Sequence, residues 1–273
     1  MPAWICATCG NHYPEADRPP GSCAICSDER QWVPASGQRW TTLTELSTVG
    51  HVSDVREVEP GLTGIGADPP VAIGQRALLV QTAEGNLLWD PSGFIDDGAI
   101  EAVRDLGGLR AISASHPHFY GAMTQWSLAF GAEILLPATD SHWLARSEAP
   151  VRTWSDALQV LPGVTLIQCG GHFPGSAVVH WAGGADGAGA LFTGDTIFVT
   201  PGEDRLTFVW SAPNRIPLPE AAVRRIVDSV RSYDFDRIYG GWWQPILRSG
   251  ARAALEASAD RYVQFLRGEA KVD

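Results

Sequence analysis

Two histidines that flank a proline, His116 and His118, constrain this chain of 273 residues more than any other feature. An apolar run at residues 109–113 precedes them and predicts a buried strand, and residues 123–130 have apolar side chains at helical spacing. The pair therefore lies on a strand-to-helix turn. Pro117 disfavours helix and predicts extended backbone, in which side chains two residues apart point to the same side. Both imidazoles can then reach one metal ion, although an ordinary pair of polar turn residues would give the same pattern.

Two later stretches also place a possible metal ligand directly after a predicted strand. His172 is flanked by glycines at the end of the apolar run 164–167, and Asp195 follows a glycine after a further apolar run. Two histidines, a glycine-flanked histidine and a Gly-Asp pair, each after a strand and in this order, resemble the metallo-β-lactamase superfamily.

The resemblance covers roughly residues 40–270. It implies an α/β protein with a four-layer α/β/β/α sandwich, in which ligands lie on loops at one edge of two packed sheets. It also implies a first metal site at His116, His118, His172 and Asp195, the last of which bridges both metals in two-metal members.

The departures from the family pattern are specific. The pattern continues with Asp and His where this chain has Tyr120 and Gly121, and its last His falls near Trp242. All the ligands private to the second metal site are therefore missing. We predict one metal ion at this edge, either zinc or iron.

Four of the five cysteines form two CxxC pairs near the N-terminus: Cys6, Cys9, Cys23 and Cys26. Two such turns at this separation indicate a tetrathiolate metal site, as in zinc ribbons and rubredoxin-like modules. We favour zinc over iron because a structural site needs no redox chemistry. Disulfides and a redox pair are the alternatives.

These cysteines define a tetracysteine module, residues 1–34, which precedes the large domain at 35–273. The module has few large apolar residues, so we expect metal binding to supply most of its folding free energy. His12, between the pairs, is expected to be a solvated turn residue. Further along, the glycine-rich stretch 61–66 is expected to be a surface loop.

Charge and hydropathy narrow the range of partners. The net charge is −11 and the pI is about 5.0, which argues against nucleic acid and anionic membranes, since both select basic surfaces. The chain has no apolar run of membrane-spanning length and no signal-peptide pattern, so we expect a cytoplasmic location and a small-molecule substrate. The sequence is silent on oligomeric state.

An irregular aromatic segment at residues 197–217 directly follows Asp195 and is expected to border the metal. Phe198, Trp210 and Trp242 are the candidate substrate-binding residues, although core aromatics would look the same. Tyr120 stands where a ligand would be, and its hydroxyl is a candidate donor to a bound oxyanion; a packed core aromatic is the alternative.

Three functions fit these features. The leading one is a metal-dependent hydrolase, in which the ion polarises a carbonyl or phosphoryl oxygen and Asp195 is a fourth ligand or a hydrogen-bond acceptor. The second is a mononuclear iron enzyme of oxygen or sulfur chemistry, because histidines with one carboxylate suit Fe(II). The third is a non-catalytic protein that binds a metal or a small ligand.

Overall fold

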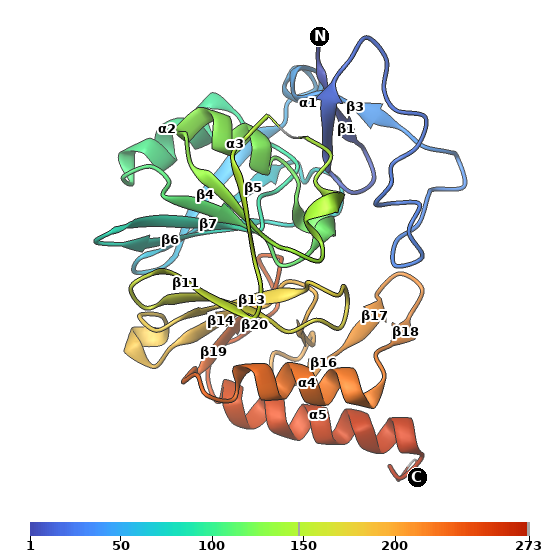
Figure 1. The fold of residues 1–273 in the computed structure, drawn as a ribbon, viewed down its shortest axis with the longest axis vertical. Coiled ribbons are helices and arrows are strands. Elements are labelled where there is room, and N and C mark those ends of the chain that lie inside the picture. Colours follow the sequence, from blue (N-terminus) through green and yellow to red (C-terminus); the bar gives the residue numbers. More distant parts are fainter. Residues whose placement is uncertain (147, 272–273) are drawn as a thin grey trace.

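Two β-sheets pack face to face and helices cover the outer face of each, as the computed structural model of the chain shows (Figure 1). The structure describes residues 1–146 and 148–271. The predicted four-layer α/β sandwich is confirmed. One apolar core fills the space between the sheets, and a further core lies under the helices on each outer side.

The first sheet is mixed. In spatial order its strands are β10 (Val151–Trp154), β9 (Glu133–Pro137), β8 (Ala111–Ser113), β7 (Gly85–Trp89), β6 (Ala77–Thr82), β5 (Leu62–Asp68) and β4 (Val52–Glu59). Strands β7, β8 and β9 run parallel, and parallel neighbours need crossover connections. Helices α2 (Asp97–Asp105) and α3 (Met123–Phe130) supply them and cover this sheet.

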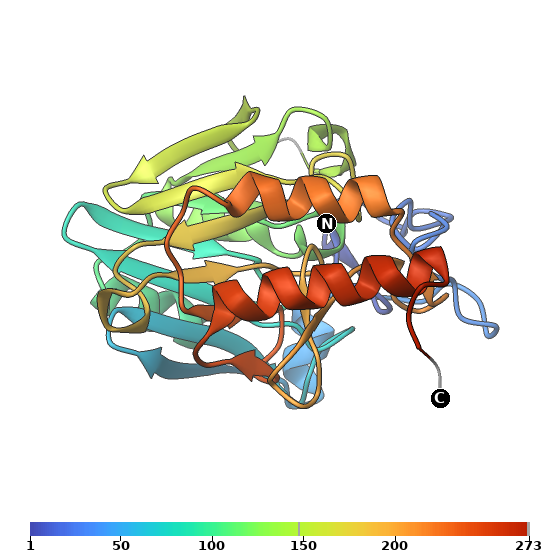
Figure 2. The ribbon, with the colours of Figure 1, turned by 90° about the horizontal axis from the view of Figure 1, so that it is seen from below.

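The second sheet has the strands β11 (Ala157–Leu161), β12 (Val164–Gln168), β13 (Ala177–Trp181), β14 (Ala190–Phe192), β19 (Arg237–Tyr239) and β20 (Ile246–Leu247). The chain crosses from β14 to the parallel β19 through α4 (Glu220–Val230), and α5 (Ala251–Arg267) lies beside α4 on the same face (Figure 2). Helix α4 buries one face against this sheet, with the residues Ala222, Val223, Ile226, Val227 and Val230.

Short elements complete the fold. The segment that was predicted to be irregular forms two small hairpins, β15 (Phe198–Val199) with β16 (Leu206–Thr207) and β17 (Val209–Ser211) with β18 (Ile216–Pro217). Single 3-10 turns lie at Pro117–Phe119, Ser141–Trp143 and Ala185–Gly187. Within residues 1–146 and 148–271, no helix combines the length and the apolar character that a membrane crossing needs.

The glycine-rich stretch 61–66 is a strand, and its prediction as a surface loop was wrong. Gly61 is in the turn before β5, and residues 62–66 belong to β5, which is paired between β4 and β6. A Cβ atom on Gly64 would lie 2.5 Å from the indole of Trp243. The glycines therefore make room for a tryptophan that packs across the strand, a use of glycine that composition does not distinguish from a loop.

The N-terminal segment forms a small sheet of β1 (Ala3–Cys6), β2 (His12–Glu15) and β3 (Trp40–Thr41), followed by α1 (Leu43–Thr48). Strand β3 lies beyond residue 34, so this sheet includes a strand from outside the predicted module; the boundary itself stays a prediction. His12 was predicted to be solvated, and this was wrong. It is buried on β2, and its Nε2 atom lies 3.0 Å from the carbonyl oxygen of Gly93 in the large domain.

Candidate metal centres

His116 and His118 follow β8 at the edge where the two sheets meet. His116 is extended, but Pro117–Phe119 is a 3-10 helix with proline at its first position. The prediction of extended backbone on both sides of Pro117 is therefore confirmed at His116 and was wrong for the residues after the proline. Proline is tolerated in the first turn of a helix, because the amide it lacks would have no intrahelical partner there. The two imidazoles still converge, with ring centroids 4.8 Å apart.

His172 and Asp195 come from the second sheet. His172 lies in the loop between β12 and β13, and Asp195 follows β14. Gly194 has a φ of +47°, and a Cβ atom there would lie 2.1 Å from the Ser115 hydroxyl oxygen. Only glycine therefore lets the Asp195 loop lie against the turn that carries the histidine pair.

The four side chains form one compact cluster whose donor atoms all lie within 4.8 Å of one another. His118 Nδ1 is 3.3 Å from His172 Nε2, and Asp195 Oδ2 is 3.5 Å from His116 Nε2 and 3.8 Å from His172 Nε2. A tetrahedral ion with bonds of about 2.0–2.1 Å separates its ligand atoms by roughly 3.4 Å. The cluster therefore has the dimensions of a four-coordinate ion.

The hydrogen bonds around the cluster also fit a metal. His172 Nδ1 lies 2.8 Å from the Trp210 carbonyl oxygen, which assigns the proton to Nδ1 and leaves the Nε2 lone pair facing Asp195. His116 Nδ1 lies 2.9 Å from the Ser115 hydroxyl. Within the described residues, His116 Nε2 and Asp195 Oδ1 are buried atoms that make no hydrogen bond. Buried polar atoms of this kind call for a ligand.

Burial sets the protonation of the cluster. Burial, with the neighbouring imidazoles, lowers the pKa of His118 and brings that of His172 to about 4. Burial alone would raise the pKa of Asp195, but the imidazoles of His116 and His172 outweigh it and hold that pKa below its usual value. At neutral pH His118 and His172 therefore offer imidazole lone pairs and Asp195 offers a carboxylate, which are the forms that bind a cation.

The four N-terminal cysteines form a second cluster, as predicted. The Sγ atoms of Cys6 and Cys26 are 3.6 Å apart, as are those of Cys9 and Cys23. Tetrahedral zinc with bonds of about 2.3 Å would place sulfurs roughly 3.8 Å apart. In the described residues none of the cysteines is in a disulfide. The geometry fits a closed structural site and leaves the identity of the metal open.

Polar donors surround these sulfurs. The amides of Gln38 and Asn11 donate to Cys6 and Cys9 at 3.1 and 3.6 Å, and the Tyr13 hydroxyl donates to Cys23 at 3.2 Å. Hydrogen bonding with Cys23 raises the pKa of Cys9. A bound cation would offset the repulsion between four thiolates at this spacing, and the surrounding donors would stabilise their charge.

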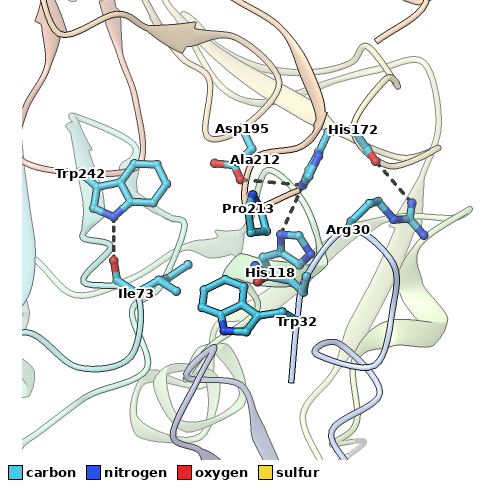
Figure 3. A pocket seen from close by; sticks show the side chains of 10 residues that line it. Arg30, Trp32, Ile73, His118, His172, Asp195, Ala212, Pro213 and Trp242 are labelled. Carbon is cyan, nitrogen blue, oxygen red and sulfur yellow. Dashed lines mark hydrogen bonds and ion pairs between the residues drawn. The ribbon is translucent and has the colours of Figure 1, made fainter. Parts of the chain in front are cut away.

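A pocket of about 250 Å³ opens onto the histidine cluster (Figure 3). Its lining combines cluster residues with a largely apolar wall drawn from distant parts of the chain: Arg30, Gln31, Trp32, Ile73, His118, His172, Asp195, Ala212, Pro213 and Trp242. Ala212 and Pro213 belong to the segment 197–217, which was predicted to border the metal because it follows Asp195 in the sequence. Sequence reasoning missed Ile73 and the three residues of the tetracysteine module, and no local pattern marks them.

The other predicted site residues lie as follows. Trp242 lines the pocket and donates from Nε1 to the Ile73 carbonyl oxygen at 2.9 Å. Phe198 stacks on Trp242 with ring centroids 6.3 Å apart, and Trp210 contributes its main-chain oxygen to His172. Tyr120 is buried in the core, and its hydroxyl donates to the Asp140 carbonyl oxygen at 3.2 Å. This contact fits the packed-aromatic alternative, so we do not retain Tyr120 as an oxyanion donor.

Gly121 stands where the family pattern places a second-site histidine. Its φ is +37°, and a Cβ atom would lie 2.3 Å from the Pro91 carbonyl oxygen and 2.7 Å from that of Ser92. The backbone around this position therefore excludes any side chain. We keep the absence of a second metal site as a prediction, which this crowding supports.

We expect Gly121→Ala to destabilise the protein by more than about 3 kcal/mol, because left-handed strain adds to an atomic clash. Gly131→Ala is the matched control: its φ is +67°, but a Cβ atom there meets nothing within 4 Å. That variant should lose only about 1–2 kcal/mol. Urea unfolding measures both, and equal losses would contradict the crowding at Gly121.

Comparison with known proteins agrees with this architecture. A sequence model of the Metallo-beta-lactamase superfamily matches residues 72–257. A Bacillus subtilis (strain 168) protein described as "Uncharacterized protein YmaE" is 38% identical over 271 residues, which is 98% of each chain. Among solved structures, VMB-1 aligns with a TM-score of 0.57 and 11% identity over 78% of this chain and 98% of its own. A B3 metallo-beta-lactamase with an active-site glutamic acid aligns with a TM-score of 0.53 and 15% identity over 89% and 97%. The match of the family model to residues 72–257, together with the shared fold, shows that this chain belongs to the metallo-beta-lactamase superfamily.

Proposed function

We propose that this protein is a metal-dependent hydrolase of a small-molecule substrate, with one metal ion held by His116, His118, His172 and Asp195. The observation that carries the proposal is the position of the cluster: buried ligand atoms face the floor of a pocket large enough for a small organic molecule. The superfamily consists mostly of metallo-hydrolases, which supports the same reaction class. Zinc or iron is the candidate ion.

An ion at this position would supply Lewis-acid polarisation of a substrate carbonyl or phosphoryl group. The chain supplies the rest. His172 is oriented by the Trp210 carbonyl oxygen, and Asp195 keeps its charge because imidazoles surround it. The pocket wall beside the cluster is largely apolar, which favours an apolar substrate body.

Asp195 has a dual role in this proposal. Four protein ligands close a tetrahedron, whereas a catalytic site keeps a position open. Asp195 Oδ2 faces the imidazoles, and Oδ1 is buried without a protein partner in the described structure. We propose that Oδ2 would help to hold the ion as a weak fourth ligand and that Oδ1 would accept a hydrogen bond from a water molecule at the cluster.

Charge and thiol chemistry support the proposed partners and location. The net charge of −11 favours a small molecule over nucleic acid or an anionic membrane. The tetracysteine cluster needs reduced sulfur, so we propose a reducing compartment, the cytoplasm.

The test is Asp195→Asn in the metal-loaded protein, assayed on a panel of small aryl esters, thioesters and phosphate esters. We expect kcat/KM to fall at least about a hundredfold, because the amide removes the charge that faces the ion and the acceptor that faces water. Asp186→Asn, on an exposed turn, is the matched control and should behave as the unmodified protein. Absence of hydrolysis across the panel in protein with full metal content would favour the binding-protein alternative.

A further inference from the structure

The tetracysteine module does not stand apart from the metal pocket. Three consecutive residues of the module, Arg30, Gln31 and Trp32, line the same pocket as His118 and His172. Figure 3 labels Arg30 and Trp32 among them. Trp32 shares the lining of the pocket with His118, and its side chain is 43% exposed. An exposed indole on the wall of a pocket offers a flat apolar face that a ligand can cover.

Hydrogen-bonded turns connect this wall to the cysteines. The amide of Ser27 donates to the Cys23 carbonyl oxygen at 3.0 Å, that of Asp28 to Ile25 at 3.3 Å, and that of Gln31 to Asp28 at 3.0 Å. The chain therefore passes from the second CxxC pair to the pocket wall through successive turns. A metal that fixes Cys23 and Cys26 also fixes the position of the wall.

Hydrogen bonds also connect the pocket wall, residues 30–32, and the adjacent Glu29 to the large domain. Ser211 and Asn214 donate to the carbonyl oxygens of Arg30 and Glu29 at 3.2 and 2.9 Å. The Arg30 guanidinium lies 3.7 Å from the centroid of the Phe173 ring and donates to the His172 carbonyl oxygen at 3.3 Å. The wall is thus built into the site on both sides.

The charged side chain of the pocket wall, that of Arg30, is already paired with another residue of the module. Arg30 donates from Nε and Nη2 to the Asp28 carboxylate at 2.6 and 2.8 Å, so its charge is paired within the module. Asp195 faces the imidazoles. The surface left for a substrate body is mainly apolar, with two indoles and small aliphatic groups: Trp32, Ile73, Ala212, Pro213 and Trp242.

We propose that the tetracysteine module is the recognition element of the pocket and that Trp32 is its specificity-determining residue. It selects uncharged compounds with a flat apolar group next to the polar group that reaches the ion. This inference rests on the proposed function, since it assigns the substrate class of the same site.

The test uses two chelators that differ only in the group beside the metal-binding head, benzohydroxamic acid and acetohydroxamic acid. Calorimetry on the zinc-loaded full-length protein gives the ratio of their dissociation constants without any turnover. We expect the unmodified protein to prefer the phenyl compound by at least about tenfold, because the phenyl group buries more apolar area than a methyl group. In Trp32→Ala this preference should fall about fivefold, with the loss of one aromatic face.

Two further variants make the result specific. Val33→Ala alters the adjacent residue, which is 42% exposed, and should keep the full preference; Trp32→Phe should restore most of it. An unchanged ratio in Trp32→Ala, or an equal fall in Val33→Ala, would overturn the assignment of Trp32. Loss of the phenyl preference in Trp32→Ala, in a protein that hydrolyses none of the esters, would support the recognition role and overturn only the proposed hydrolase activity.

Discussion

His118→Ala is expected to reduce the metal content of the protein from two equivalents to one. The ion that is lost is the one at the histidine cluster. Only two imidazoles and the Asp195 carboxylate, a weak ligand in our proposal, would remain there, and these three donors are too few to hold it. The tetracysteine ion should stay, since its donors are all sulfurs of a separate cluster. Elemental analysis gives the count, and X-ray absorption should show nitrogen and oxygen ligands disappear while sulfur ligands remain.

His142→Ala is the matched control, because His142 is an exposed histidine two residues beyond Asp140 and lies outside both clusters. It should retain both equivalents. Two ions about 3.5–4 Å apart in the unmodified protein, as in two-metal hydrolases, would contradict the predicted loss of the second site. An empty histidine cluster under metal-replete conditions would contradict the hydrolase proposal itself.

The metal clusters were predictable because their signals are local. His116, His118, His172 and Asp195 each follow a strand, and strands of packed sheets bring their ends to one edge. The CxxC spacing likewise places each pair of thiols on one turn. The four-layer fold was implied by the family resemblance that this order of motifs carries. In each case a short stretch of sequence contains both the ligand and the element that positions it.

The pocket wall was not predictable because it depends on docking between distant segments. Trp32 lies at the pocket where Arg30 packs on Phe173 and Ser211, at the end of β17, donates a hydrogen bond to the Arg30 carbonyl oxygen. His12 was misjudged for the same reason, since its partner is the Gly93 carbonyl in the large domain. The misjudged backbone at Pro117 has a different cause: proline fits the first turn of a 3-10 helix as well as it fits an extended chain.

Cys9→Ser is expected to release the tetracysteine ion and unfold the N-terminal module while the large domain stays folded. Structural zinc contributes about 10–16 kcal/mol to the folding of small modules, and this module has only a minor core of its own to offset such a loss. The histidine cluster should keep its ion, since Asn11 and Arg30 contact only the main-chain oxygens of His118 and His172. Elemental analysis and resistance to proteolysis measure the two effects.

The same variant should lose the phenyl preference in hydroxamate binding, because the Trp32 wall unfolds with the module. Cys169→Ser is the control: this thiol is buried at the end of β12, outside the tetracysteine cluster, and its loss should leave both ions and the preference in place. Full metal content in Cys9→Ser would refute the tetrathiolate site. Unfolding of the whole chain would show that the module and the sandwich are one cooperative unit, in which the hydrogen bonds from Asn11 and Arg30 carry stability as well as position.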